Sequence, residues 1–553
     1  MGLLGRMRGY RLPDRYIINV KDIIVVIIAL LLCLIPLAVK LIVIDKNSMI
    51  AGFFSGGQQL ANVFGQVDAF SLIKVYMLYI FAIVLALLFS IAVRRQSIVI
   101  DTDYVVLICF AFGIWILVTA YLSMNPAVAF FGVRDRFEGA FAFCAYIIIM
   151  TVARYTINAN WHIHMLMIAI LTGGTIIAII AIMQFFGINI LAVPYISEFI
   201  SGSVFKDVAI IQATKGSAYG TLYNPNYLSG YMAMILFVPI TYYLFTNRSW
   251  IRYVMLILSV LCWMGLLSSK SSSGFVAAGI GMLIVILIKL FINRFNRQSW
   301  KQISILILCF IIAFIGMNVA SDGVMWGEYT SIFGYLYQLA SIDVSDITGQ
   351  ERLIDFEQLD KVQADKWRQL LSYYPYESTI DRLGSGRGFI WRNTVMLIKE
   401  RPIIGYGLDT IMYNLPQGDL RKLYAFGHMN IIVDKPHSLY LQLAHGAGIP
   451  ALILFIIMNT IVLWKTAVVL YRRLDIKLLA IGMLVFAYLV QGVFNDSTVG
   501  VSVIYWVMLG VLMKLIFINS YESYEKDKEI SGDKQSIEYK ENLEDRQDLQ
   551  ENI

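Results

Sequence analysis

The sequence predicts an all-α polytopic membrane protein with about twelve transmembrane helices and one large extracytoplasmic helical loop. Hydrophobic residues make up 58% of the 553-residue chain and charged residues only 15%, whereas soluble domains usually contain about 25% charged residues. Many apolar runs reach the roughly 20 residues that a helix needs to cross a bilayer. A membrane β-barrel would instead show short segments of alternating hydrophobicity.

Twelve apolar segments are candidate membrane spans. Basic residues gather in every second connection between them, and the positive-inside rule places those connections in the cytoplasm. Both termini are then cytoplasmic, which agrees with an even number of spans. The predicted spans are 22–44, 72–93, 103–122, 138–156, 163–185, 227–246, 252–268, 274–293, 302–320, 438–464, 477–494 and 498–518.

The spans divide the chain into four regions. Residues 1–320 supply an N-terminal bundle of about nine spans, and residues 438–518 supply about three more. The segment 321–437 is too long for a structureless loop in a compact protein, so we predict a helical subdomain on the outer face. The polar, acidic residues 519–553 are predicted to be a disordered cytoplasmic tail or, alternatively, a docking helix for a partner.

The short outward connection 123–137 holds two arginines, Arg134 and Arg136, although outward loops are expected to be poor in basic residues. One interpretation is an anion site, because guanidinium groups bind phosphate through paired hydrogen bonds. The other is a surface cluster in which Asp135 and Glu138 neutralise the two arginines. Charge alone leaves both interpretations open.

The large loop is predicted to contain a helix over Gly386–Arg401 that Pro402 ends. Its start carries Arg387, Trp391 and Arg392. A helix N-terminus with arginines favours anions. Tryptophan is also common at membrane interfaces, so a surface helix that leans on the bilayer is the simpler interpretation.

His437 lies where the chain is about to enter the tenth predicted span, and a histidine there can exchange protons near neutral pH or be an ordinary interfacial residue. Tyr440 would lie on the same side of a helix as His437, since positions three apart are neighbours, but packing is its expected role. His445 is expected to pack inside the bundle. Before the sixth span, Asn226 is predicted to cap the helix.

Several classes of function are disfavoured. The chain has no phosphate-binding glycine loop, and no histidines, cysteines or carboxylates stand at metal-ligand spacing. No basic face occurs in a soluble domain, so nucleic-acid binding is not expected. Ionisable residues are nearly missing from the middle of the predicted spans, which disfavours an ion-coupled transporter.

The chain carries a series of short motifs, in the order Arg136–Gly139, Asn224–Asn226, Gly386–Trp391, Pro402–Gly407 and His437–Leu441, with Gly448 downstream. Taken together and in this order, they resemble the O-antigen ligase and O-antigen polymerase superfamily over roughly 100–510. The chain departs from the family pattern at Ser438, where the family often has Asn, at Gly446, where it often has an acidic residue, and at Lys270, where Arg is common.

The resemblance implies a glycosyltransferase of the GT-C kind that acts on the outer face of the bacterial cytoplasmic membrane. Its donor would be an undecaprenyl-diphosphate-linked glycan and its acceptor a glycan, a lipid or a protein. A single inverting displacement without metal or other cofactor is expected. Arg136 and Arg387 would bind the diphosphate, and His437 would act as base on the acceptor hydroxyl. Secondary substrate contacts are expected from Arg134, Arg392, Glu138, Asn226, Trp391 and Tyr440.

Two other functions stay open. A flippase of a lipid-linked glycan would need a polar path through the bundle and would tolerate His437→Ala. A scaffold for envelope assembly would depend on the acidic tail and not on the outward arginines. Within the transferase class, the sequence does not separate ligase, polymerase and protein O-oligosaccharyltransferase, and it leaves the sugar, the acceptor and the oligomeric state open.

Overall fold

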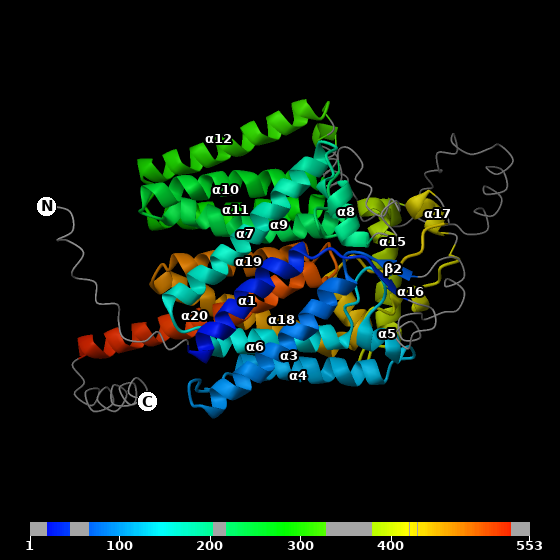
Figure 1. Cartoon of the computed structure of the whole chain (residues 1–553), viewed down its shortest axis with the longest axis horizontal. Helices are drawn as coiled ribbons and strands as arrows, with labels where there is room; N and C mark the ends of the chain where they lie inside the picture. The colour runs from blue at the N-terminus through cyan, green and yellow to red at the C-terminus, as the bar shows by residue number, and fades with distance from the viewer. Residues whose placement is uncertain are drawn as a thin grey trace, which may run out of the picture.

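The protein is a bundle of long helices that run side by side (Figure 1). The all-helical fold is confirmed, apart from one short antiparallel pair of strands, β1 (Ile42–Ile44) and β2 (Gln66–Asp68). The computed structural model describes residues 19–44, 66–202, 217–323, 325–327, 379–419, 421–427 and 430–531.

All twelve predicted spans coincide with helices. In the part of the chain that the structure describes, ten helices are long and apolar enough to cross a membrane, and α6 (Ala140–Thr156) and α19 (Ile476–Gln491) are shorter. The protein is therefore a polytopic membrane protein, and the count of twelve spans stays a prediction. The ten are α1 (Val20–Leu37), α3 (Leu72–Arg94), α4 (Tyr104–Tyr121), α7 (Asn160–Phe185), α9 (Pro225–Phe245), α10 (Ser249–Ser268), α11 (Ser272–Ile292), α12 (Arg297–Ala320), α18 (Leu439–Arg472) and α20 (Val499–Ser531).

Two helix ends differ from the prediction. The first span does not extend to residue 44, because α1 ends at Leu37 and the β-branched run 42–44 pairs with β2. At the other end of the chain, α20 continues through Ser531, past the predicted limit at 518. Glutamate and lysine are good helix formers, and Glu522 stands four residues before Lys526, a favourable helical spacing. The rest of the predicted tail lies outside the described residues.

The short helices and the strand pair gather at one end of the bundle, which we call the loop end (Figure 1). Within the predicted large loop, residues 328–378 lie outside the described ranges. The described residues from 379 to 437 form helices around a small apolar core that includes Phe389, Ile411 and Leu415. The loop-end helices are α5 (Pro126–Phe131), η1 (Ile190–Ala192), α8 (Pro194–Ser201), α15 (Thr379–Glu400), α16 (Ile411–Asn414) and α17 (Arg421–Phe426).

Helix α18 is broken at Gly448, whose φ of 77° and ψ of 172° are not helical. A side chain at this position would overlap the carbonyl of Ile403, so only glycine fits. The segment after α15 thus holds the first piece of α18 in place, and this piece begins two residues after His437. Three backbone hydrogen bonds join the two segments: Tyr406 N to His445 O (2.9 Å), Gly407 N to Gly446 O (2.8 Å) and Ile449 N to Pro402 O (2.7 Å).

Helix α9 lies at the centre of the bundle, where 94% of its apolar stretch is buried. It packs against α7, α10, α11 and α19. Pro225 occupies the first helical position, where its missing N–H costs nothing, and Asn224 caps the helix. The first turn of α9 therefore lies at the loop end, where the Asn224 cap fixes its backbone.

Candidate active site

Three residues that the sequence singled out meet at the loop end. Arg136 lies between α5 and α6, Arg387 near the start of α15, and His437 directly before α18. The charges of Arg387 and Asp496 both act on His437, and the charge of Asp496 also acts on Arg136. The structure thus brings these three segments, which are far apart in the sequence, into one electrostatic cluster.

Arg136 is buried and binds two carboxylates and one backbone carbonyl. Its Nε donates to Asp409 Oδ1 at 2.8 Å, and the second Asp409 oxygen accepts the backbone N–H of Val133 at 3.1 Å. Its Nη2 donates to the carbonyl of Asp434 at 2.9 Å, and Nη1 lies 3.4 Å from that residue's carboxylate. The side chains of Arg136 and Asp409 are each 1% exposed. Arg136 therefore fastens the loop before α6 to the segment after α15 and to the segment that leads into His437.

We expect Arg136→Met to lower the free energy of unfolding by about 3–5 kcal/mol, because it leaves Asp409 buried without its partner. Asp409→Asn should also destabilise, and the double variant should lose less than the sum of the two single variants. Unfolding curves of the purified protein in detergent would measure all three. Strictly additive losses would show that the pair does not interact as the structure indicates.

The charged neighbours of Arg136 decide between an anion site and a self-neutralising surface cluster in the connection 123–137. Arg134 is on the surface, 54% exposed, and its Nε lies 3.7 Å from Asp135, as the self-neutralising cluster predicts. Glu138 is instead fully buried and accepts the hydroxyl of Tyr146 at 2.5 Å. The surface cluster therefore comprises Arg134 and Asp135, while Arg136 and Glu138 belong to the interior.

His437 is held between α15 and the turn that follows α19. Its φ of 51° lies in the left-handed region, which is uncommon for residues other than glycine. The indole Nε1 of Trp391 donates to the preceding carbonyl, that of Pro436, at 3.0 Å. The imidazole is 24% exposed, and its Nδ1 lies 3.4 Å from Asp496 Oδ2. Trp391 thus positions the histidine from α15, while Asp496 faces it from the other side.

The surroundings of His437 favour the neutral imidazole. Burial lowers its pKa because the imidazolium loses hydration. Asp496 opposes this effect by attracting the charged form, whereas Lys435 and Arg387 reinforce it by repulsion. The net result is a pKa below the ordinary value. At neutral pH the ring can therefore accept a proton.

Asp496 is the functional candidate that the sequence interpretation missed. Its side chain is 1% exposed, and neither oxygen has a hydrogen-bond partner among the described residues, although His437 faces one of them. Its charge also acts on Arg387. A buried carboxylate between an imidazole and a guanidinium can stabilise the imidazolium that forms when the histidine accepts a proton. The only signal in the sequence was an acidic residue in the three-residue outward connection 495–497.

Arg387 carries a guanidinium for which no described residue is a partner. Its side chain is partly buried, and in the described part of the chain it makes no hydrogen bond or ion pair. Burial lowers its pKa, and Asp496 is the charge that opposes this shift. A guanidinium that is desolvated but not hydrogen-bonded is a ready ligand for a phosphate or carboxylate.

Two glycines set the position of Arg387. Gly384 and Gly386 have φ values of 61° and 86°, which break the regular helix inside α15. A side chain at Gly386 would overlap the ring of Phe426, so glycine is required there. The regular part of α15 therefore begins at about the predicted start, and Arg387 stands in its first turn.

A family model described as O-antigen ligase matches residues 254–456. This region belongs to the O-antigen ligase superfamily. The matched region runs from α10 into α18 and includes Arg387 and His437, whereas Arg136 and Asp496 lie outside it. No curated protein matches the chain.

Two of the predicted substrate contacts in the O-antigen ligase region have other partners. Arg392 Nη2 donates to the buried Asp381 Oδ2 at 3.0 Å, and its neighbouring charges are Arg421 and Asp419, so it faces α17 and not His437. The hydroxyl of Tyr440 donates to the carbonyl of Leu489 at 2.9 Å. Tyr440 therefore packs α18 against α19. His445, expected to pack in the bundle, is buried and stacks on Tyr406.

A polar network joins the O-antigen ligase region to the turn that carries Asp496. The prediction that Asn226 caps α9 is wrong. The cap is Asn224, two residues earlier, and its side chain accepts the N–H of Asn226. Asn226 instead accepts the hydroxyl of Ser271 at 2.8 Å. Asn495 Nδ2 donates to the carbonyl of Asn226 at 3.2 Å and to Ser273 Oγ at 2.9 Å. These bonds fix the turn next to Asp496.

No group of three or more residues suited to a metal ion occurs within the described ranges.

Proposed function

We propose that this protein transfers a glycan from an undecaprenyl-diphosphate carrier to an acceptor hydroxyl at the loop end. The charge bias of the connections would place this end on the outer face of the bacterial cytoplasmic membrane. The observation that carries the proposal is that His437 faces the buried Asp496, next to the guanidinium of Arg387, which has no partner among the described residues. The O-antigen ligase match supports a glycosyl-transferring enzyme.

In the proposed reaction, the acceptor oxygen attacks the anomeric carbon of the donor while the bond from that carbon to the diphosphate oxygen breaks. Because Nδ1 of His437 faces Asp496, its Nε2 is the nitrogen that takes the acceptor proton. Arg387 binds the diphosphate and stabilises the negative charge that grows as it leaves. The products are the transferred glycan, with inverted configuration, and the free carrier diphosphate.

Arg136 supports this site mainly through other residues. Direct contact with a diphosphate would require it to leave Asp434, because its side chain is 1% exposed. Its bonds to Asp434 hold the segment that ends at His437, so it acts as a positioning residue. Arg134 is more than half exposed and is a second guanidinium that a donor can reach.

The proposal is tested by turnover with purified protein in lipid nanodiscs. The reaction would contain an undecaprenyl-diphosphate oligosaccharide and membrane-extracted acceptors, with and without EDTA. Release of undecaprenyl diphosphate together with a larger glycan conjugate is the expected result. A ladder of products would indicate a polymerase, and a single addition would indicate a ligase or a protein-directed transferase. Donor binding without release, under conditions where lipid-linked glycan crosses the bilayer, would contradict the proposal in favour of a flippase.

The rate should fall in acid as His437 becomes protonated. Since burial and nearby cations lower the pKa of His437, the acid limb of kcat/KM should lie below the ordinary histidine value of about 6.5. In Asp496→Asn the attraction that raises this pKa is lost, so the limb should move to still lower pH while the maximal rate falls. A pH profile of both proteins measures this. A shift of the limb to higher pH in the variant would contradict the assigned role of Asp496.

A further inference from the structure

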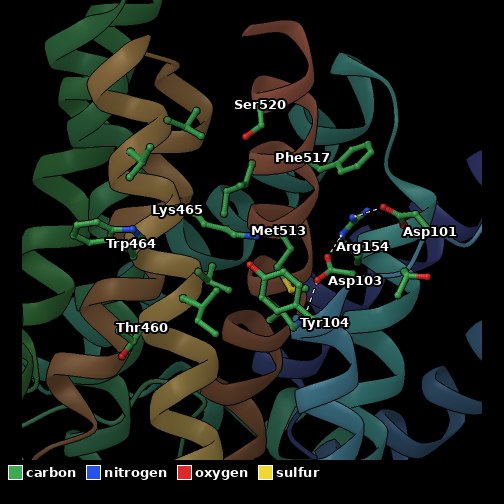
Figure 2. Close-up of a pocket in the computed structure, with 17 residues that line it drawn as sticks. Asp101, Asp103, Tyr104, Arg154, Thr460, Trp464, Lys465, Met513, Phe517 and Ser520 are labelled. Carbon is green, nitrogen blue, oxygen red and sulfur yellow. Dashed lines mark hydrogen bonds and ion pairs between the residues drawn. The ribbon is translucent and has the colours of Figure 1, made fainter. Parts of the chain in front are cut away.

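A cavity lies at the end of the bundle opposite the loop end, between α4, α6, α18 and α20. Its volume is about 700 Å3, which is in the range of small-molecule sites. None of the candidate site residues Arg136, Arg387, His437 and Asp496 lines this cavity. Figure 2 shows charged side chains on two sides of this space.

One wall carries two carboxylates held by a buried arginine. Arg154 is 2% exposed, and it donates to Asp101 Oδ2 at 2.9 Å and to Asp103 Oδ2 at 3.1 Å. The three side chains together carry one net negative charge. The carboxylate of Asp101 is 36% exposed, so it can still accept a hydrogen bond from a cation in the cavity.

The opposite wall carries a cation without an acidic partner. Lys465 extends from α18 toward Tyr104 (Figure 2), and its Nζ lies 4.4 Å from the centre of that ring. It makes no ion pair or hydrogen bond with any residue in the described ranges. An ammonium that rests on an aromatic face keeps its donors available for an anion.

Most of the remaining lining is apolar, with Thr102, Thr460 and Ser520 as its polar members, and the rim carries exposed aromatic residues. Trp464 is 70% exposed and Tyr104 is 49% exposed, as is typical of side chains at a membrane interface. A soluble phosphate compound would leave this apolar lining without a partner. The apolar lining residues are Val105, Ile461, Val462, Val468, Val469, Met513, Ile516 and Phe517.

We propose that this cavity binds one phospholipid with a zwitterionic, ammonium-bearing headgroup. The phosphate lies at Lys465, the ammonium at Asp101, and an acyl chain lies along the apolar lining. A purely anionic headgroup would bring no cation to the partly exposed carboxylate of Asp101. The bound lipid would link α4 to α18 and α20, and in the proposed orientation it comes from the cytoplasmic leaflet. This inference does not depend on the transferase activity.

The test uses the full-length protein and phosphatidylethanolamine with a photoreactive diazirine in one acyl chain. Crosslinked peptides would be mapped by mass spectrometry, with unlabelled phosphatidylethanolamine or phosphatidylglycerol as competitor. We expect crosslinks within 460–469 and 513–520, displaced about tenfold more effectively by phosphatidylethanolamine, a factor that corresponds to about 1.4 kcal/mol. Equal displacement by both lipids, or crosslinks spread over the whole bundle, would overturn the proposal.

Two variants locate the headgroup contacts. Lys465→Gln and Asp101→Asn should each lower the crosslink yield at these peptides by about tenfold. Lys301→Gln is the matched control, because Lys301 is exposed on α12, away from the cavity, and its yield should equal that of the wild type. Yields unchanged in both cavity variants would overturn the proposal. If a variant does not elute from size-exclusion chromatography as a single species, the lipid competition on the wild-type protein decides the proposal without it.

Discussion

Replacing His437 with alanine is expected to lower the rate constant of glycan transfer by about two to four orders of magnitude, the usual contribution of a general base. The variant loses the group that takes the acceptor proton. His437 is 24% exposed, so its truncation opens little of the core and the fold should persist. Single-turnover release of the carrier diphosphate, with donor bound in advance, would measure the effect on chemistry.

The matched control is His164→Ala, because His164 is exposed in the first turns of α7, at the end of the bundle away from the loop end. It should retain the wild-type rate. Donor affinity should change little in His437→Ala, since the diphosphate contact is assigned to Arg387. Wild-type rates in both variants would remove His437 from the mechanism, whereas a large loss in both would indicate a general disturbance of the bundle.

Replacing Arg387 with glutamine is expected to reduce the transfer rate by about 10²–10³-fold, the loss that follows removal of one preorganised donor to a developing oxyanion. Donor affinity should also fall, because the diphosphate is charged before the reaction begins. Arg387→Lys should retain part of the transfer rate and part of the donor affinity, since lysine keeps the charge but loses the two parallel N–H donors of the guanidinium. Donor titration and single-turnover rates would separate the two effects.

Arg94→Gln serves as the control for Arg387, because Arg94 is exposed at the end of α3 that lies away from the site. It should behave like the wild type in both measurements. An Arg387→Gln variant that binds the donor with wild-type affinity would contradict the diphosphate role. Removing Arg387 also removes one repulsion on His437, so the acid limb of the variant's residual activity should move to higher pH.

The membrane-spanning part of the fold could be predicted because each span carries its own signal. Twenty apolar residues form a helix in a bilayer whatever their neighbours are. The exceptions occur where tertiary contacts decide. The run 42–44 becomes a strand because it pairs with 66–68, and the break at Gly448 reflects the segment 402–407 that lies against it. Such contacts leave no periodic pattern in the sequence.

The site could be predicted only in part. The family resemblance and the helix start in the large loop indicated Arg387, and the position of His437 before a span indicated the base. The carboxylates that define their environment were missed, because they meet only in the folded chain. Asp409 and Asp434 come from different parts of the large loop, and Asp496 comes from the turn after α19. Charge counting within one loop likewise could not show that Arg136 is buried and that Arg134 is exposed.

The most direct test is a structure of the protein with an undecaprenyl-diphosphate glycan whose anomeric bond cannot be cleaved. We expect the diphosphate at the loop end, with its oxygens about 2.7–3.2 Å from the guanidinium of Arg387 and the anomeric carbon on the side of His437 Nε2. A diphosphate bound elsewhere, such as along a polar path between the helices and out of reach of both residues, would contradict the proposed transferase site.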